Sequence, residues 1–242
     1  MKPASLIASL AAFFYASPSH ADDVAFVEAN ILSIFYHELG HALIDTENLP
    51  IFGREEDAAD IFSIFFIDAT FKEDAAIAVA ADAALGFRAE ARENGGDVAW
   101  WGLHSADQQR FYTTVCVFYG ANPDERGHLI KQFNLPEERV ESCPSEYDQA
   151  NHSWGHVLDV LGIDEPSDTL VYSGDRGDDA SLTEQIIAEE VDFLNEYYAL
   201  SHTVTVSIED CDEANAFYEP EDRTIIMCSE FEDYLFDLAE KR

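Results

Sequence analysis

The residues of this chain whose types and spacing best fit a chemical site are His37, Glu38 and His41, in the sequence HELGH. On a helix the two histidines lie one turn apart and project from the same face, so both imidazoles can bind one metal ion. Glu38 would then lie beside that ion, where a carboxylate can act as a general base. The pattern predicts a Zn²⁺ site that activates water and polarises a peptide carbonyl. The alternative is an ordinary amphipathic helix whose histidines bind nothing.

Hydrolysis at zinc also needs a third protein ligand and an open position for water. Downstream, a second helix is predicted over residues 54–66, with Glu56 and Asp60 one turn apart. This arrangement resembles zinc peptidases of the gluzincin type. The resemblance implies that Glu56 is the third ligand and that Asp60 orients His37 through its far nitrogen, with Asp60 as the alternative ligand.

The neighbouring acids on the predicted second helix point elsewhere around its axis. Glu55 and Asp57 are each about 100° from Glu56 on a helix. We therefore expect both to be solvated.

Several longer blocks make the chain similar to a known family. Together they resemble a bacterial family of secreted metallopeptidase-like proteins of unknown function, and they span most of the chain after residue 24. The resemblance implies a zinc-dependent peptidase that acts on peptides or proteins. In that family the last block precedes the zinc helix, whereas here it ends the chain, which predicts a circularly permuted order. The blocks are HELGHALID, LPIFGREEDAADIF, QQRFYTTVCVFYGANP, LPEERVESCPSEYDQANHSW and DCDEANAFYEPEDRTIIMC.

The first 21 residues have the pattern of a secretory signal peptide. Lys2 precedes an apolar run over residues 6–16, and Ser-His-Ala follows before two aspartates. We predict cleavage after Ala21 and a secreted or periplasmic bacterial protein. The alternatives are a buried helix and an uncleaved anchor, but the apolar run is short for a bilayer. No later segment has the length and apolarity of a membrane span, so none is expected after cleavage.

The chain has four cysteines, and export permits disulfides. Cys211 and Cys228 flank a predicted hairpin, whereas Cys116 and Cys143 lie on neighbouring predicted helices. We predict these two pairs as disulfides. The sequence contains no CxxC spacing, which argues against a structural zinc site.

The formal net charge is −36, from 49 acidic and 13 basic residues. This charge excludes electrostatic binding to DNA, RNA or an anionic membrane as the main activity. We interpret this charge as an acidic, well-hydrated surface that keeps an exported protein soluble in salt. The alternative is that it attracts cationic substrates.

The remaining chain, residues 22–242, suits one domain with enough apolar residues, 47 %, for a single core. Helical patterns dominate, which predicts an α+β, mostly α, zincin-like fold with a small β-hairpin. Residues 164–180 are predicted as an internal linker, and residues 200–242 as the hairpin and a last helix. Helices are predicted over residues 24–45, 54–66, 73–93, 105–119, from 123, 137–161 (one or two), 182–200 and from 229, with a strand over 203–208.

The hairpin offers an edge for substrate. Many HExxH peptidases bind the substrate as an extra strand above the metal. The NAF sequence and the strand after it are similar to a strand pair in membrane-associated CAAX-processing peptidases. We predict Asn215, Ala216, Phe217 and Tyr218 as the substrate edge; the alternative is a hairpin held by its disulfide with no such role.

A peptidase also needs a donor for the oxyanion. His104 is the first candidate, with Tyr112 and His156 as alternatives, although such residues usually pack or cap helices. The sequence predicts an exported zinc peptidase with Glu38 as base. The competing hypothesis is an exported zinc-binding protein without peptidase activity, such as a binding or inhibitory module. Glu38 argues against it, because a site that does no hydrolysis needs no general base.

Overall fold

The computed structural model describes residues 20–95 and 97–242, and it has the predicted α+β, mostly helical architecture. Within these residues no helix combines the length and apolarity needed to cross a membrane. The helices are α1 (His20–Thr46), α2 (Glu55–Thr70), α3 (Glu73–Glu93), α4 (Asp107–Ala121), α5 (Pro123–Phe133), α6 (Glu137–Val140), α7 (Cys143–Ala150), the π-helical turn Asn151–Gly155, α8 (His156–Leu161), α9 (Leu182–Tyr197) and α10 (Glu230–Ala239). The strands are β1 (Leu170–Tyr172), β2 (Val204–Glu209), β3 (Ala216–Glu219) and β4 (Thr224–Cys228).

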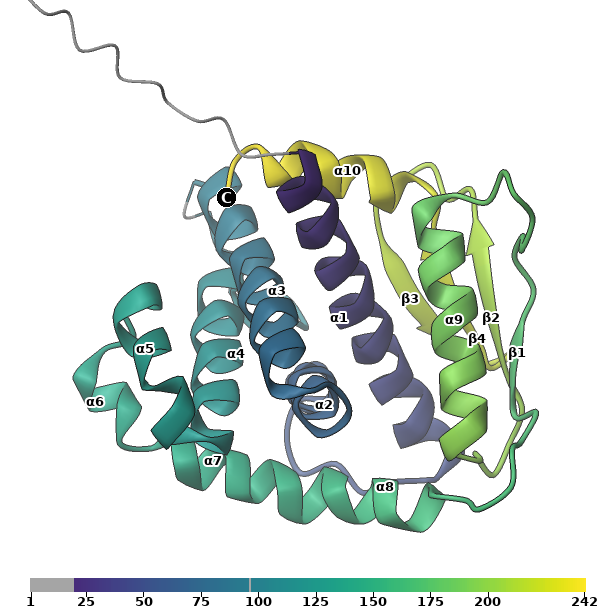
Figure 1. Ribbon diagram of the computed structural model, residues 1–242, viewed down its shortest axis with the longest axis horizontal. Coiled ribbons are helices and arrows are strands. Elements are labelled where there is room, and N and C mark those ends of the chain that lie inside the picture. Colours follow the sequence, from purple (N-terminus) through teal and green to yellow (C-terminus); the bar gives the residue numbers. More distant parts are fainter. Residues whose placement is uncertain (1–19, 96) are drawn as a thin grey trace, which may run out of the picture.

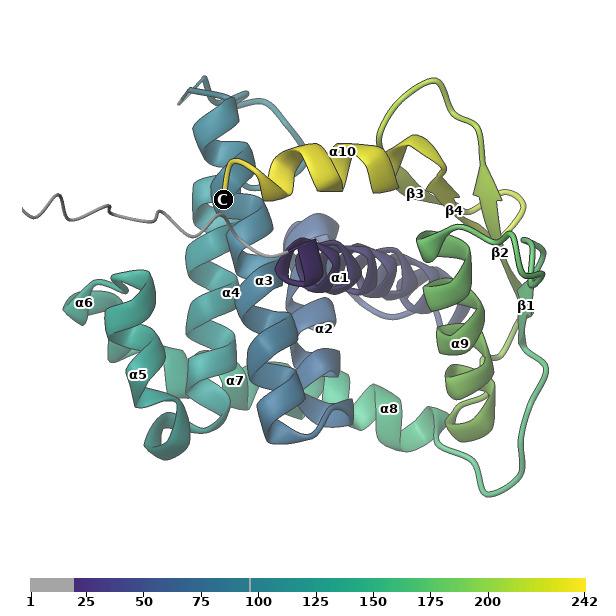
Figure 2. The same ribbon diagram turned by 45° about the horizontal axis from the view of Figure 1, so that its top comes forward.

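Helix α1 runs through the middle of the molecule (Figure 1). Helices α3 and α4 lie on one side of it, α9 and the sheet on the other, and α10 crosses over it (Figure 2). The sequence predicted one buried face, which includes Phe35 and Leu39. The structure also buries Phe26, Ile31 and Tyr36 completely, because elements from distant parts of the chain enclose the helix. A helix enclosed in this way gives a rigid base for the side chains of HELGH.

The four strands form one sheet in the order β1-β2-β4-β3. Strands β1, β2 and β4 are parallel neighbours, and β3 pairs with β4 in the antiparallel sense, with Phe217 opposite Ile226. The segment predicted as a linker, residues 164–180, contains β1, whose Leu170 is buried. The linker is therefore partly a sheet edge, while β3 forms the other edge.

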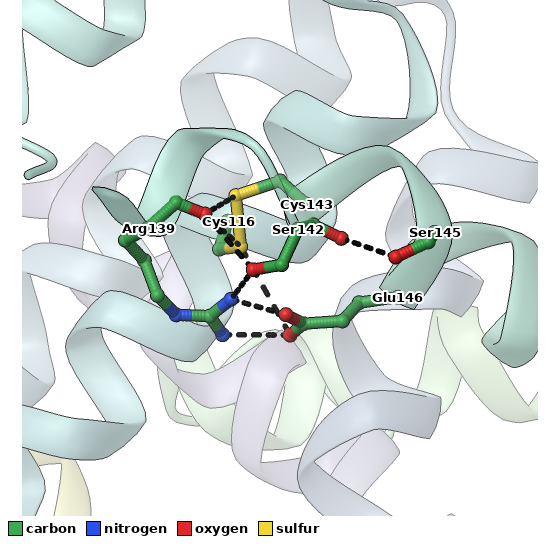
Figure 3. Close-up of a disulfide and its surroundings, with 6 residues drawn as sticks. All are labelled: Cys116, Arg139, Ser142, Cys143, Ser145 and Glu146. Atoms are coloured by element: carbon green, nitrogen blue, oxygen red, sulfur yellow. Dashed lines mark hydrogen bonds and ion pairs between the residues drawn. A yellow bond between two sulfur atoms is a disulfide. The ribbon is translucent and has the colours of Figure 1, made fainter. Parts of the chain in front are cut away.

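Both predicted disulfides are present. The Cys116–Cys143 bond joins α4 to α7 with a Cα–Cα distance of 5.0 Å, and the Cys211–Cys228 bond closes the hairpin region with 5.5 Å. Figure 3 shows the first bond beside Arg139, which pairs with Glu146. By the entropy of loop closure, a bond across 27 residues stabilises the fold by about 3.5 kcal/mol.

The two ends of the described chain lie next to each other. Arg242 forms an ion pair of 3.3 Å with Asp23 near the start of α1. A circular permutation requires ends that lie close together, so this contact is compatible with the permuted block order. The permutation itself stays a prediction. The predicted signal peptide lies outside the described residues, apart from residues 20 and 21, which begin α1.

A partly buried carboxyl group on α3 makes stability depend on pH. Burial, together with the charges of Asp107 and Glu93, raises the pKa of Glu90 to about 7, although Arg110 and the hydroxyl of Tyr234 oppose the rise. A raised pKa in the folded state means that stability is lost as pH rises from the unfolded value towards the folded one. When the pH is raised from 5 to 8, the unfolding free energy of the parent should therefore fall by about 2 kcal/mol more than that of Glu90→Gln.

Urea unfolding of both proteins at the two pH values measures this difference. Glu137→Gln, at an exposed position on α6, is the control and should respond to pH as the parent does. An equal effect of pH on the parent and on Glu90→Gln would contradict the prediction.

Candidate metal centre

The site begins with the close contact between α1 and α2. A Cβ atom at Gly40 would lie 3.1 Å from the Cα of Ala59, so a larger residue would separate the helices. Beside this contact, the Ser63 hydroxyl donates to the Ser33 carbonyl over 2.6 Å. The glycine of HELGH therefore brings the acidic start of α2 against the two histidines.

Three donor atoms converge where the helices meet. Nε2 of His37 lies 3.2 Å from Nε2 of His41, and Oε2 of Glu56 lies 3.3 Å and 3.2 Å from these atoms. An ion bound tetrahedrally through bonds of about 2.0 Å spaces its ligand atoms about 3.3 Å apart. The three side chains, which form a potential metal-binding group, thus have the spacing that one metal ion requires.

Each histidine also has a carboxylate at its other nitrogen. Nδ1 of His37 lies 2.8 Å from Oδ1 of Asp60, and Nδ1 of His41 lies 2.8 Å from Oε1 of Glu55. A carboxylate at Nδ1 fixes the proton there and leaves Nε2 for a metal. Half of the Glu55 side chain is exposed, as expected, but the crossing of the helices also brings its carboxylate to His41, a contact that the sequence did not predict. Asp57 is likewise not free: its Oδ1 accepts from the Ser105 hydroxyl over 2.7 Å.

Arg110 supports this arrangement from α4. Its Nε and Nη2 donate to both oxygens of Asp60 over 2.8 and 2.7 Å, and its guanidinium lies 4.1 Å from the ring centre of Phe87. A paired guanidinium holds the carboxylate in one plane facing His37. Sequence reasoning missed this residue, whose only signal was its place in the block QQRFYTT.

The electrostatic field of the site favours positive charge. Burial lowers the pKa of His37, but hydrogen bonds with Asp60 and Glu56 outweigh it and raise the value to about 9. Hydrogen bonds, first from His104, hold the pKa of Glu56 below its usual range. Burial opposes ionisation of Asp60, but Arg110 and His37 lower its pKa. Burial raises the pKa of Glu38, as suits a base.

The site opens into a cleft of about 730 Å³. Glu38 lines it, although only 6 % of the residue is exposed. The edge strand β3 lines the same cleft with Ala216, Phe217 and Tyr218, whereas Asn215 precedes the strand and is not in the lining. Most of the predicted substrate edge therefore lies beside the candidate metal ligands.

Of the candidate oxyanion donors, only His104 lies at the cleft. Its Nε2 is 2.9 Å from Oε2 of Glu56, and half of its side chain is exposed. Tyr112 packs against the core from α4, and His156 lines a separate hollow on α8. The structure thus brings His104 together with His37, Glu38, His41 and Glu56, and separates the two alternatives from them.

Comparison with known proteins gives one family. A family model described as "putative metallopeptidase" matches residues 3–158 and 175–241, which is most of the chain. The unmatched residues 159–174 include β1. Neither the curated proteins nor the solved structures give a match.

Proposed function

Because the chain belongs to this metallopeptidase family, we propose that it is an exported, zinc-dependent peptidase of the gluzincin type. The observation that carries the proposal is the triangle of His37, His41 and Glu56, with Glu38 beside it in one cleft. Two imidazoles and one carboxylate are a ligand set typical of catalytic zinc, and they leave a fourth position open. The carboxylates at both far nitrogens support the same assignment.

Each residue then has a defined role in hydrolysis. A zinc ion held by the triangle supplies Lewis acidity for the water and the scissile carbonyl. Glu38 takes the proton of the attacking water and passes it to the leaving amine. His104 stabilises the developing oxyanion, which is consistent with an Nε2 that lies 2.9 Å from Glu56.

The peptide substrate binds along β3. Among the described residues this strand ends the sheet, so that one of its edges pairs with no other strand there, and three of its residues line the cleft. An extended peptide can form main-chain hydrogen bonds with such an edge regardless of its sequence. The strand thus supplies affinity, and the side chains around the cleft supply specificity.

The proposal is tested by metal analysis of the purified mature protein and by cleavage of a peptide library with and without a chelator. We expect one zinc ion per chain and cleavage that stops when zinc is removed and returns when it is restored. A protein that binds zinc but cleaves no peptide would instead be a binding or inhibitory module. Absence of stoichiometric zinc would overturn the proposed centre.

Export has its own test. Protein recovered from the producing cell should begin at Asp22 and have no free thiol before reduction, because the two disulfides use all four cysteines. The intact mass gives the first residue, and the mass after alkylation under denaturing, non-reducing conditions gives the number of free thiols. Retention of residues 1–21, or four alkylated cysteines, would contradict export.

A further inference from the structure

Large apolar side chains are exposed on the two loops that border the cleft. In the described part of the chain seven such side chains are exposed, and four of them lie on two loops: Phe52 (98 % exposed), Trp100 (78 %), Trp101 (86 %) and Leu103 (76 %). We call these four the apolar rim. Exposed apolar clusters of this kind mark binding surfaces in soluble proteins.

Both loops reach the candidate metal centre. The loop between α1 and α2 contributes Asn48 and Arg54 to the lining of the cleft, with Phe52 between them in sequence. The loop between α3 and α4 contributes Gly102, Leu103 and His104. Leu103 of the rim therefore lines the cleft itself, and the other three rim residues lie within two positions of a lining residue in sequence.

The loop that carries the tryptophans is tethered at both ends. The Asn94 amide donates to Asp107 over 2.9 Å, and Ser105 donates to Asp57 on α2. Within the loop, the amide of Gly102 donates to the carbonyl of Ala99 over 2.7 Å. A loop held in this way presents its apolar side chains in advance of binding, which lowers the entropy cost of binding.

A second hollow of about 550 Å³ adjoins the cleft. It shares Gly102, Leu103 and His104 with the cleft, and its other walls are mixed, with Val98 beside Asp97 and Asp107. Leu103 thus borders both spaces. The hollow offers room for a side chain next to the metal centre.

We propose that the apolar rim binds large apolar side chains of an extended polypeptide substrate, next to the bond that is cleaved. This inference rests on the proposed function. Main-chain pairing along β3 selects no sequence, so selection falls to side-chain contacts such as those of the rim. The net charge of −36 opposes pairing with a second copy and contact with anionic lipid. Because apolar side chains are buried in folded proteins, the favoured substrates are unfolded or extended chains.

The tryptophans themselves give a direct measurement. The chain has three tryptophans, and the third, Trp154, is buried with 6 % exposure. In the zinc-loaded Glu38→Gln protein, acrylamide should quench mainly Trp100 and Trp101. A peptide with Leu and Phe around its central bond should protect them, and it should bind roughly tenfold more tightly than the same peptide with Ser at those positions.

A pair of variants tests the rim in the active protein. Trp100→Ser with Trp101→Ser should raise KM for the apolar peptide roughly tenfold, leave kcat within about twofold, and abolish the preference over the Ser peptide. The control is Val160→Ser with Val171→Ser, which removes two exposed apolar side chains elsewhere and should keep the preference.

The outcomes separate the two proposals. Equal cleavage of both peptides by the parent would overturn the role of the rim and leave the peptidase intact. Absence of cleavage of any peptide would overturn the proposed function. The inference would also be overturned if the apolar peptide does not protect the tryptophans but another partner does. Protection by self-association would assign the rim to a second copy, and protection by phosphatidylcholine vesicles would assign it to lipid.

Discussion

Glu38→Gln is expected to keep its metal and to hydrolyse peptides at least about a hundredfold more slowly than the parent. Glutamine has nearly the same size, so the packing around this buried residue is preserved. Its amide cannot accept the proton of the attacking water, whereas the three candidate ligands are unchanged. Zinc content and kcat/KM for one cleaved peptide, measured on the same preparation, test the two halves of this expectation.

The matched control is Glu28→Gln, on the same helix but outside the lining of the cleft. It should behave as the parent in both measurements. A Glu38→Gln protein that cleaves as fast as the parent would disprove the general base proposed here. Loss of zinc from that protein would instead assign Glu38 to metal binding.

The second large effect is expected at the ligands of α2. Glu56→Ala should empty the site on dialysis, because it removes the one charged ligand of the three. Asp60→Ala should weaken zinc binding by roughly 10–100-fold, since Asp60 acts through His37. Glu55→Ala should weaken it less, because 51 % of the Glu55 side chain is exposed, against 10 % for Asp60.

Competition with a chelator of known affinity measures this order. Asp57→Ala is the control on the same helix turn, because in the described part of the chain the Asp57 carboxylate accepts from Ser105 and forms no hydrogen bond with a histidine. An empty site in Asp60→Ala together with a full site in Glu56→Ala would indicate an aspartate-ligated centre. The peptidase would survive that result, but the gluzincin assignment would not.

The parts of the site that the sequence predicted depend on local geometry. Residues four positions apart on a helix share a face, and this rule alone relates His37 to His41 and Glu56 to Asp60. The contact of Glu55 with His41 was not predicted, because a position around α2 says nothing about which side α1 approaches. The contact of Arg110 with Asp60 spans 50 residues and depends on the packing of α4, which no local pattern specifies.

The fold likewise has parts that local sequence patterns predict and parts that depend on packing between distant elements. The hairpin of β3 and β4 was predictable, because two alternating runs flank turn residues. Strand β1 was not, because three residues are too few for a pattern and its partner β2 is parallel and lies beyond α9. The apolar rim was also beyond the sequence, since exposure is a property of the packed loops.

The division of the candidate ligands between α1 and α2 links the metal to the stability of the protein. With zinc bound as proposed, the ion would join His41 on α1 to Glu56 on α2 across the loop between these helices. Above the dissociation constant, each tenfold rise in free zinc then adds about 1.4 kcal/mol to the free energy of unfolding. In surroundings poor in zinc, a larger fraction of the molecules would be unfolded and accessible to other proteases. The lifetime of the protein would then report the local supply of zinc.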